Sequence, residues 1–425
     1  MGNVVNLEPG AKERHAQGSN IRTPRRRRSS KTALVLGGGG FTGGVYEIGA
    51  LRALDLLAVD RTVNQFDVYV GTSAGALIAA LAANGVTPEQ MMRVVNDQVP
   101  SPFRDLNWRM LLRPNYREFA AKGIQLPLHL VGLARSALSG IRSFSTVDLA
   151  VGLADALPSG LYTGKGIEDY VATVLDEDPD RTDDFRELAH ELYLCATDLD
   201  TCERVVLGGE GWDDVRISAA VRASTALPMV YAPHRLKDRE LVDGGIVSTT
   251  NLDVAVHAGA QLIVVVNPLV PYVNDFSKEI PTLFGARTRR VSDMGFPAVA
   301  YQTFKLLAYQ RLHEMARHWQ ERYPGVDIVL IEPETDDELM FQTNILNYTS
   351  RLEVARHGFR SVTVKLAAEY DGLREVCARH GIEISATRVR KVVRHFADER
   401  EPTRAWRRIL EQTTGALLRQ AGSGS

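Results

Sequence analysis

Ser73 is the residue of this sequence whose surroundings most clearly predict chemistry. It stands at the centre of Gly71-Thr72-Ser73-Ala74-Gly75, between an apolar strand that begins at Val68 and a small-residue helix that ends near Asn84. A serine on such a sharp strand-to-helix turn holds its hydroxyl away from the backbone, and the two glycines leave room for the turn. The N–H groups that start the helix favour an oxyanion beside the serine. The turn predicts a nucleophile, although Gly-x-Ser-x-Gly alone also arises by chance.

A run of glycines earlier in the chain predicts an anion-binding loop. The apolar strand Thr32–Leu36 leads into Gly37-Gly38-Gly39-Gly40-Phe41-Thr42-Gly43-Gly44, and apolar residues at helical spacing follow. A strand followed by a glycine-rich loop and a helix points backbone N–H groups at a bound anion. The glycines also match the dinucleotide fingerprint, but the next strand ends in Val70-Gly71 without the acidic residue that binds ribose. A P-loop is excluded because no Gly-Lys-Ser/Thr follows. We therefore expect an oxyanion loop that faces Ser73, and no nucleotide cofactor.

Asp243 is the carboxylate that we expect beside the serine. Glu240-Leu241-Val242 is predicted to be a strand, and Asp243-Gly244-Gly245 follows it directly. Open α/β sheets place their sites at the carboxyl ends of strands, which is also where Ser73 is expected. Taken alone, Asp-Gly is more typical of an ordinary turn. Both interpretations are open at the level of these residues.

Strands and helices alternate from Thr32 onward, which predicts an α/β fold with a mainly parallel sheet covered on both faces. We divide the chain into a disordered basic N-terminal tail at 1–30, a catalytic domain at 31–370 and a basic helical extension at 371–425. Residues 99–147 are rich in aromatic and apolar residues. They are predicted to form either a lid or lipid-contact insertion, or helices packed on the core.

Composition and charge are those of a globular protein with basic ends. Hydrophobic residues make up 44% and charged residues 24% of the chain. Residues 1–31 hold eight Lys or Arg against two Glu, and residues 371–425 hold eleven against seven Asp or Glu. Such ends suit anionic surfaces, and solvated tails are the simpler interpretation.

The cysteines and the apolar runs bear on metal sites, compartment and membrane insertion. The three cysteines contain no CxxC pair, so we expect no disulfide framework, no metal site and a reducing, cytoplasmic location. No apolar run reaches the roughly 18–20 residues of a membrane span. Residues 1–30 lack the apolar segment of a secretory signal.

Together, the three motifs resemble those of the patatin-like phospholipases. The resemblance rests on Gly38–Gly43 for the glycine-rich oxyanion loop, Gly71–Gly75 for the nucleophile elbow and Asp243–Gly245 for the Asp-Gly-Gly motif. The runs Ala223–Pro228 and Asp327–Pro333 are also similar, so the resemblance covers roughly residues 32–365. In one departure, Thr42 stands where the family usually has Arg or Lys.

The resemblance implies a three-layer α/β fold and a lipid acyl hydrolase of the phospholipase A type. Ser73 would be the nucleophile and Asp243 the base of a Ser–Asp dyad that works through an acyl-enzyme. The backbone N–H groups of Gly38, Gly39 and Gly40, with that of Ala74, would form the oxyanion hole. No metal or cofactor is implied. The implied partner is a lipid substrate at a membrane surface, bound peripherally. Nucleic acid is not expected, and a protein activator is unknown.

Two other functions stay open. An α/β-hydrolase with a Ser–Asp–His triad is one of them, because His257 follows Asp243 in the expected chain order and His313 is a further candidate. Against it, that fold usually places several strands before the serine, whereas only one precedes the strand of this elbow. A catalytically weak patatin-like scaffold that binds lipid or a protein partner is the other, because Thr42 replaces the usual basic residue.

Overall fold

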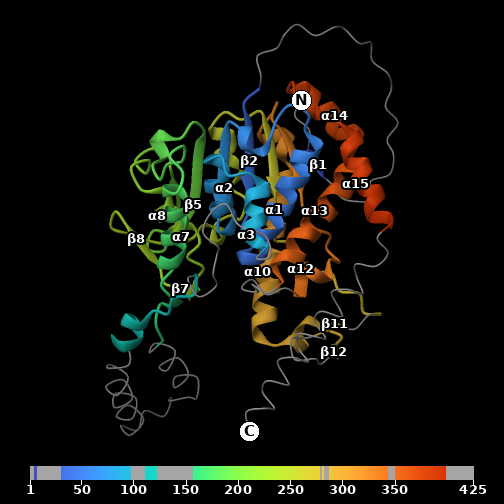
Figure 1. Cartoon of the computed structure of the whole chain (residues 1–425). Helices are drawn as coiled ribbons and strands as arrows, with labels where there is room; N and C mark the ends of the chain where they lie inside the picture. Colours follow the sequence, from blue (N-terminus) through green and yellow to red (C-terminus); the bar gives the residue numbers. More distant parts are fainter. Residues whose placement is uncertain are drawn as a thin grey trace.

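The computed structural model describes residues 4–6, 30–96, 111–121, 157–277, 280–281, 287–342 and 350–398. A large sheet runs through the centre of this part of the chain (Figure 1). Neighbouring strands follow the order β1-β13-β10-β2-β3-β5-β9-β8, and β6 also pairs with β5. The strands are β1 (Val4–Asn6), β2 (Thr32–Leu36), β3 (Val68–Thr72), β5 (Glu191–Asp198), β6 (Arg204–Leu207), β8 (His234–Leu236), β9 (Arg239–Asp243), β10 (Leu262–Val266) and β13 (Asp327–Ile331).

The main part of the sheet is parallel. From β1 to β5, each strand runs parallel to its neighbour in the sheet. By contrast, β6 and β9 are antiparallel to β5, and β8 is antiparallel to β9. The parallel strands are nearly continuous runs of aliphatic residues because both of their faces are covered. Two small two-stranded sheets lie outside this one, namely β4 (Gly160–Tyr162) with β7 (Met229–Tyr231), and β11 (Ile280–Pro281) with β12 (Arg287–Thr288).

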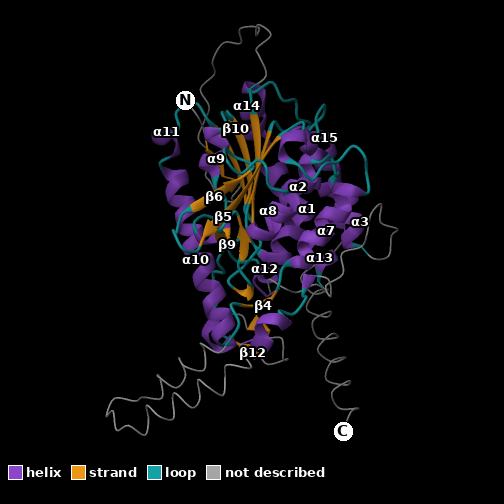
Figure 2. Cartoon of the chain, turned by 90° about the vertical axis from the view of Figure 1, so that its left-hand side faces the viewer, coloured by secondary structure: helices purple, strands orange, loops and turns teal. Residues whose placement is uncertain are grey.

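Helices cover both faces of the sheet, which Figure 2 shows nearly edge-on. One layer contains α1 (Gly40–Leu57), α2 (Ala74–Ala83), α3 (Pro88–Val95), α7 (Lys165–Asp176), α8 (Ile217–Ser224), α13 (Arg351–Ala368), α14 (Tyr370–Arg379) and α15 (Ala386–Asp398). The other contains α9 (Leu252–His257), α10 (Phe296–Arg317) and α11 (Trp319–Arg322). The short helix α12 (Glu338–Gln342) follows β13. The predicted α/β class, with a mainly parallel sheet between two helical layers, is confirmed.

Alternation along each strand separates the two cores. In β2, Leu34 and Leu36 belong to the core under α1 and α2, whereas Ala33 and Val35 belong to the core under α9. All four side chains are fully buried. Successive side chains of a strand point to opposite faces, so one short apolar run supports both layers. This rigid centre positions the loops at the carboxyl ends of the strands.

The N-terminal segment differs from the expected disordered tail, because Val4–Asn6 forms β1 and pairs in parallel with β13. The outer edge of β13 would otherwise leave backbone N–H and C=O groups unpaired, and the β-branched Val4 and Val5 suit a strand there. Residues 7–29, with the arginine run, lie outside the described residues.

The C-terminal elements also differ in detail from the prediction. Helix α10 ends at Arg317, and a separate α11 begins at the buried Trp319, whose indole N–H donates to the Val326 carbonyl at 2.9 Å. Helices α13 and α14 are separated at Glu369. Residues 371–398 pack into the core under α1, so the boundary expected at 371 does not separate two cores. The rest of the predicted helical extension, residues 399–425, lies outside the described residues.

The predicted insertion is described only in part. Residues 97–110 and 122–156, which hold most of the expected lid or lipid-contact segment, lie outside the described residues. The described piece, 111–121, contains helical residues 116–121 and pairs with β4 through a bridge between Pro114 and Tyr162. In the described part of the chain, no helix is both long and apolar enough to cross a membrane.

Helices α1 and α13 cross at two glycines. A Cβ atom on Gly49 would lie 2.3 Å from the Ala355 carbonyl oxygen and 2.5 Å from the Phe359 nitrogen. A Cβ atom on Gly358 would lie 2.6 Å from the Tyr46 carbonyl oxygen. Real Cβ atoms do not approach backbone atoms this closely, so only glycine fits at either position. The glycine loop, which opens α1, is thereby held by a helix some 300 residues later in the chain.

We expect Gly49→Ala to lower the free energy of unfolding by about 3 kcal/mol, because the added methyl group forces α1 away from α13. Chemical denaturation monitored by circular dichroism measures the change. Gly372→Ala is the matched control. Its Cβ atom would meet nothing within 4 Å in α14, so it should raise stability by about 0.5–1 kcal/mol. Equal effects of the two substitutions would contradict the close crossing.

Candidate active site

Ser73 occupies a strained turn between β3 and α2. Its backbone has φ 57° and ψ −126°, a conformation that non-glycine residues rarely adopt. The helix begins directly after it, at Ala74. A Cβ atom on Gly75 would lie 2.4 Å from the Leu36 carbonyl oxygen, so the turn fits against β2 only with glycine there. The predicted nucleophile elbow therefore has the geometry that its sequence indicated.

Strand β5 brings Asp243 to this turn. Thr72, at the end of β3, lies opposite Cys195 of β5, and Asp243, at the end of β9, lies opposite Ala196. Residues 194–197 of β5 are paired with β6 along their other edge, so β3 and β9 share one edge of β5. The two strands meet end to end at adjacent register positions. Ser73 and Asp243, 170 residues apart, become neighbours.

The two side chains are directly hydrogen bonded. Ser73 Oγ donates to Asp243 Oδ2 at 2.6 Å, and Oδ1 accepts the Gly245 N–H at 2.8 Å. Asp243 is 2% exposed and Ser73 is 9% exposed. Burial raises the pKa of the Asp243 carboxyl to about 6, against the opposing effect of the hydrogen bonds from Ser73 and Gly245. A short, desolvated contact of this kind lets a carboxylate accept a hydroxyl proton.

The oxyanion donors differ in part from the prediction. The Gly38 N–H donates to the Thr249 carbonyl at 3.0 Å, so this predicted donor is occupied. In the described part of the chain, no acceptor pairs with the N–H groups of Gly39, Gly40 or Ala74. Gly40 and Ala74 begin α1 and α2, whose first N–H groups have no partner within the helix and carry partial positive charge.

The remaining motif glycines make close backbone contacts. Gly38 lies against Ser73, because its Cβ atom would be 3.2 Å from Ser73 Cβ. Cβ atoms on Gly39 and Gly43 would both meet Pro268 at about 3 Å. Gly71 packs on α2, Gly244 on the backbone of Cys195, and Gly245 on the Asp243 carboxylate. These residues shape the site by leaving room for backbone.

Ser224 is a site residue whose role the sequence did not reveal. Its hydroxyl accepts the Ser73 N–H at 3.0 Å and donates to the Cys195 carbonyl at 2.6 Å, and the side chain is fully buried. It therefore ties the strained residue to β5. In the sequence, the Ala223–Pro228 run carries only a resemblance to the family, and no pattern along the chain links Ser224 to Ser73.

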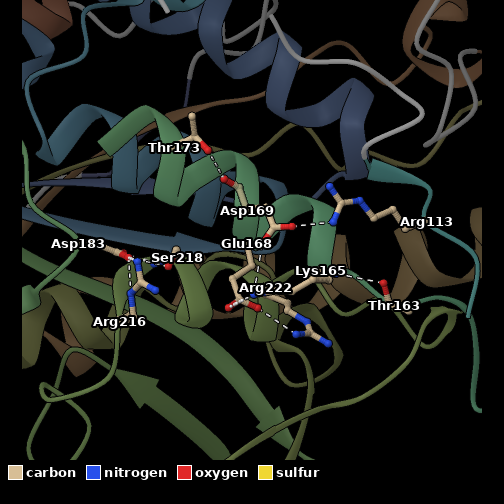
Figure 3. A network of polar contacts seen from close by, with 10 residues as sticks. All are labelled: Arg113, Thr163, Lys165, Glu168, Asp169, Thr173, Asp183, Arg216, Ser218 and Arg222. Atoms are coloured by element: carbon tan, nitrogen blue, oxygen red, sulfur yellow. Dashed lines mark hydrogen bonds and ion pairs between the residues drawn. The ribbon is translucent and has the colours of Figure 1, made fainter. Parts of the chain in front are cut away.

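Ion pairs hold the helix that carries Ser224. On α8, Arg222 pairs with Glu168 of α7 at 2.9 Å, and the start of the same helix is capped by Asp183, which accepts from the Ser218 N–H at 2.6 Å (Figure 3). Arg113 pairs with Asp169 of α7 at 2.6 Å. These contacts join α7, α8 and segment 111–121 around the site.

Asn251 supports the elbow from the other side. Its Nδ2 donates to Thr72 Oγ1 at 2.9 Å, and its Oδ1 accepts from Arg204 at 3.0 Å. Arg204 in turn pairs with Asp253 at 2.6 Å. Asn251 is fully buried and has a left-handed backbone, φ 46°, so the network holds it in a conformation that asparagine tolerates better than most residues. Nothing in the linear sequence signalled this network.

The histidines named as triad candidates lie elsewhere. His313 Nε2 contacts Glu332 Oε2 at 2.9 Å, and no contact joins His257 to Ser73 or Asp243 in the described part of the chain. Both carboxylate oxygens of Asp243 already have partners. Among the described residues, no group of three or more His, Cys, Asp or Glu side chains is arranged to hold a metal ion.

An apolar pocket adjoins the starts of α1 and α2, with Gly44 and Ala74 in its wall. Because Ala74 follows Ser73, the pocket lies next to the proposed reaction centre. Its lining is almost entirely aliphatic and aromatic, with Arg351 as the charged member. The lining residues are Phe41, Gly44, Val45, Ile48, Ala74, Leu77, Ile78, Leu81, Met91, Val94, Val95, Tyr170 and Arg351.

Comparison with known families places the chain. A family model described as patatin-like phospholipase matches residues 34–256, more than half of the sequence. The chain belongs to the patatin-like phospholipase family. The matched region contains the glycine loop, the elbow and the Asp-Gly-Gly turn, and it ends before β10. The family is one of lipid hydrolases, so the resemblance inferred from the motifs is confirmed at this level.

Solved structures with similarity to this patatin-like chain include two bacterial proteins. VipD from Legionella pneumophila is 14% identical, with a TM-score of 0.32, over 80% of this chain and 67% of its own. The type III effector protein ExoU is 14% identical, with a TM-score of 0.31, over 80% of this chain. The chain spans about half of ExoU, 53% of its length.

We expect Ser224→Ala to lower the free energy of unfolding by about 1–3 kcal/mol, because the Ser73 N–H and the Cys195 carbonyl lose their buried partner. Urea denaturation measures the loss. The exposed Ser292→Ala serves as a control and should stay within about 0.5 kcal/mol of the unmodified protein. A neutral Ser224→Ala would show that the bridge does not hold the elbow.

Proposed function

We propose that this patatin-like protein is a lipid acyl hydrolase of the phospholipase A type that uses Ser73 and Asp243 as a catalytic dyad. The observation that carries the proposal is the direct 2.6 Å hydrogen bond from Ser73 Oγ to Asp243 Oδ2, with no imidazole between them. Membership in a phospholipase family supports a lipid ester as the substrate. The carboxylate takes the part that histidine plays in a triad.

The proposed reaction passes through an acyl-enzyme. Ser73 Oγ attacks the ester carbonyl carbon while its proton moves to Asp243 Oδ2. The negative charge that develops on the carbonyl oxygen is stabilised by the unpaired N–H groups of Gly39, Gly40 and Ala74. Collapse of the tetrahedral intermediate breaks the ester bond, and the leaving alcohol takes the proton from Asp243. Water then attacks the acyl-serine, giving its proton to Asp243, and the fatty acid leaves as Ser73 regains its hydrogen.

The apolar pocket beside Ala74 supports a long acyl chain as the substrate group. A hydrocarbon chain gains stability on leaving water roughly in proportion to its buried area. The wall of the pocket is made mainly by α1, α2 and α3, with Tyr170 of α7 and Arg351 of α13, so the shape of the pocket depends on how these helices pack. We infer that the acyl chain enters this pocket while the head group stays outside. The buried Thr42, in the first turn of α1, adds no positive charge to the loop.

A Ser–Asp–His hydrolase is disfavoured by the same contacts. Ser73 Oγ donates directly to Asp243, no contact joins His257 to either residue in the described part of the chain, and His313 is engaged by Glu332. A non-catalytic scaffold is disfavoured by the strained backbone of Ser73. Backbone strain of about 1–3 kcal/mol is kept only where the surrounding structure enforces it, and such residues cluster at active sites. Labelling by a fluorophosphonate distinguishes the scaffold from the enzyme, because only an activated serine reacts with it.

We expect Ser73→Ala and Asp243→Asn each to reduce kcat for a short-chain ester, and the release of fatty acid from phospholipid vesicles, by at least about 10³-fold. His257→Ala and His313→Ala serve as controls and should retain activity. Mass spectrometry of the lipid products, with a fluorophosphonate label mapped to Ser73, provides the measurement. Hydrolysis that survives Ser73→Ala, or is lost in His257→Ala, would refute the dyad.

The raised pKa of Asp243 predicts the acid side of the pH profile. The Asp243 carboxylate must be ionised to accept a proton, so kcat/KM should fall tenfold for each pH unit below about pH 6. Burial also raises the pKa of Asp55 to about 6, but Asp55 lies at the far end of α1. Asp55→Asn should therefore leave the acid limb in place. A limb near pH 4, or one that disappears in Asp55→Asn, would contradict the assignment.

A further inference from the structure

Large apolar side chains are exposed mainly on one end of the molecule. Fifteen such side chains are exposed in the described residues, and twelve belong to segment 111–121, β4, β7, α10 and the stretches next to them. The other three are Val59, Leu199 and Val364. Figure 1 shows β7 and β12 at the lower end of the molecule, and Figure 2 shows β4 and β12 there, with the lower end of α10 beside them. The twelve are Tyr116, Phe119, Leu157, Leu161, Met229, Ile246, Val273, Phe276, Phe296, Val299, Leu306 and Leu307.

Helix α10 contributes an uncharged and largely apolar stripe to this end. Phe296 is 81% exposed, and Val299, Leu306 and Leu307 follow at helical spacing. The exposed positions of its first turns also include Ala300, Thr303 and Gln310, so no charged side chain interrupts the stripe before Arg311. The opposite face of the helix is buried, through residues such as Ala308 and Leu312. A helix of a globular protein normally turns its polar face to solvent, so this stripe fits an apolar partner.

The stripe is attached to the catalytic turn. Arg311 of α10 donates to the carbonyl oxygens of Ile246 and Val247 at 3.2 and 2.8 Å. A Cβ atom on Gly245 would lie 3.7 Å from the ring of Phe304. Residues next to Asp243 are therefore in direct contact with α10, and whatever binds the stripe lies beside the site.

Arginines flank the apolar stripe. Arg289 and Arg290 are exposed, stand a few residues before α10 and have no ion-pair partner in the described part of the chain. Two exposed acidic residues, Asp275 and Asp293, lie on the same flank. On the other side, Arg117 is exposed beside Tyr116. Segment 111–121 is fixed there by the Arg113–Asp169 ion pair shown in Figure 3. Apolar side chains bordered by arginines are typical of surfaces that lie in the interface of a phospholipid bilayer.

We propose that this end of the molecule, which we call the docking face, binds the surface of an anionic phospholipid bilayer. The docking face comprises the twelve exposed apolar residues with Arg117, Arg289 and Arg290. The apolar stripe enters the boundary between head groups and acyl chains, the arginines contact phosphates, and the site faces the lipid. A second copy of the chain bound here would cover the turn after Asp243 and close the site. The choice of a bilayer rests on the proposed lipid hydrolase function, but the binding itself requires no turnover.

The test uses the full-length chain carrying Ser73→Ala, so that binding is measured without hydrolysis. Flotation with vesicles of phosphatidylcholine and phosphatidylserine gives the bound fraction. Val299→Asp should weaken binding about tenfold, and Phe296→Asp by more, because a charge enters the apolar interface. Val364→Asp is the matched control, since Val364 is also a helical valine that is 43% exposed, as Val299 is, but lies on α13. It should bind as the parent does.

A charge reversal tests the electrostatic part independently. Arg289→Glu with Arg290→Glu should remove most of the preference for vesicles that contain phosphatidylserine over phosphatidylcholine alone, together with the salt dependence. Val299→Asp binding as tightly as the parent, or Val364→Asp losing as much, would overturn the docking face. So would a dimer in size-exclusion chromatography that Val299→Asp converts to a monomer while vesicle binding is unchanged. Failure of the proposed enzyme would appear separately, as no hydrolysis of a soluble ester by the unmodified chain.

Discussion

The shared edge of β5 is the constraint on which the site depends. Strand β3 occupies this edge as far as Cys195, and β9 arrives from the opposite direction and takes over at Ala196. Backbone hydrogen bonds set the register of both strands, and a shift by one residue would move each side chain to the other face of the sheet. The contact between Ser73 and Asp243 is therefore specified by main-chain pairing before any side chain is positioned.

The site concentrates unfavourable features that the surrounding structure offsets. Ser73 has a strained backbone, Asp243 is a buried carboxylate, and the N–H groups of Gly39, Gly40 and Ala74 lack acceptors. Each of these costs stability, and each suits the proposed chemistry. The compensation comes from contacts that take no part in bond making, such as the Ser224 bridge to β5 and the glycine crossing of α1 with α13.

The proposed pocket and docking face extend the same arrangement. The starts of α1 and α2 supply N–H groups on one side of Ser73, and the same helices line the apolar pocket. The turn after Asp243 contacts α10, whose exposed stripe belongs to the docking face. A lipid taken from a bilayer at this end would have a short path to the serine.

The local sequence pattern determined most of the helices and strands, the positions of the motifs and the fold class, because these depend on residues within a few positions of one another. Gly71 and Gly75 permit the elbow, and the aliphatic run Leu262–Val266 is a buried strand in any α/β arrangement. Only the tertiary structure decided that β9 and β3 pair with the same edge of β5. It also decided that the Gly38 N–H donates to the Thr249 carbonyl, and that the Ser224 hydroxyl bridges Ser73 to β5. It also decided that the amphipathic α10 turns its apolar stripe outward. Periodicity shows that a helix has two faces, but which face is buried depends on packing with elements distant in sequence.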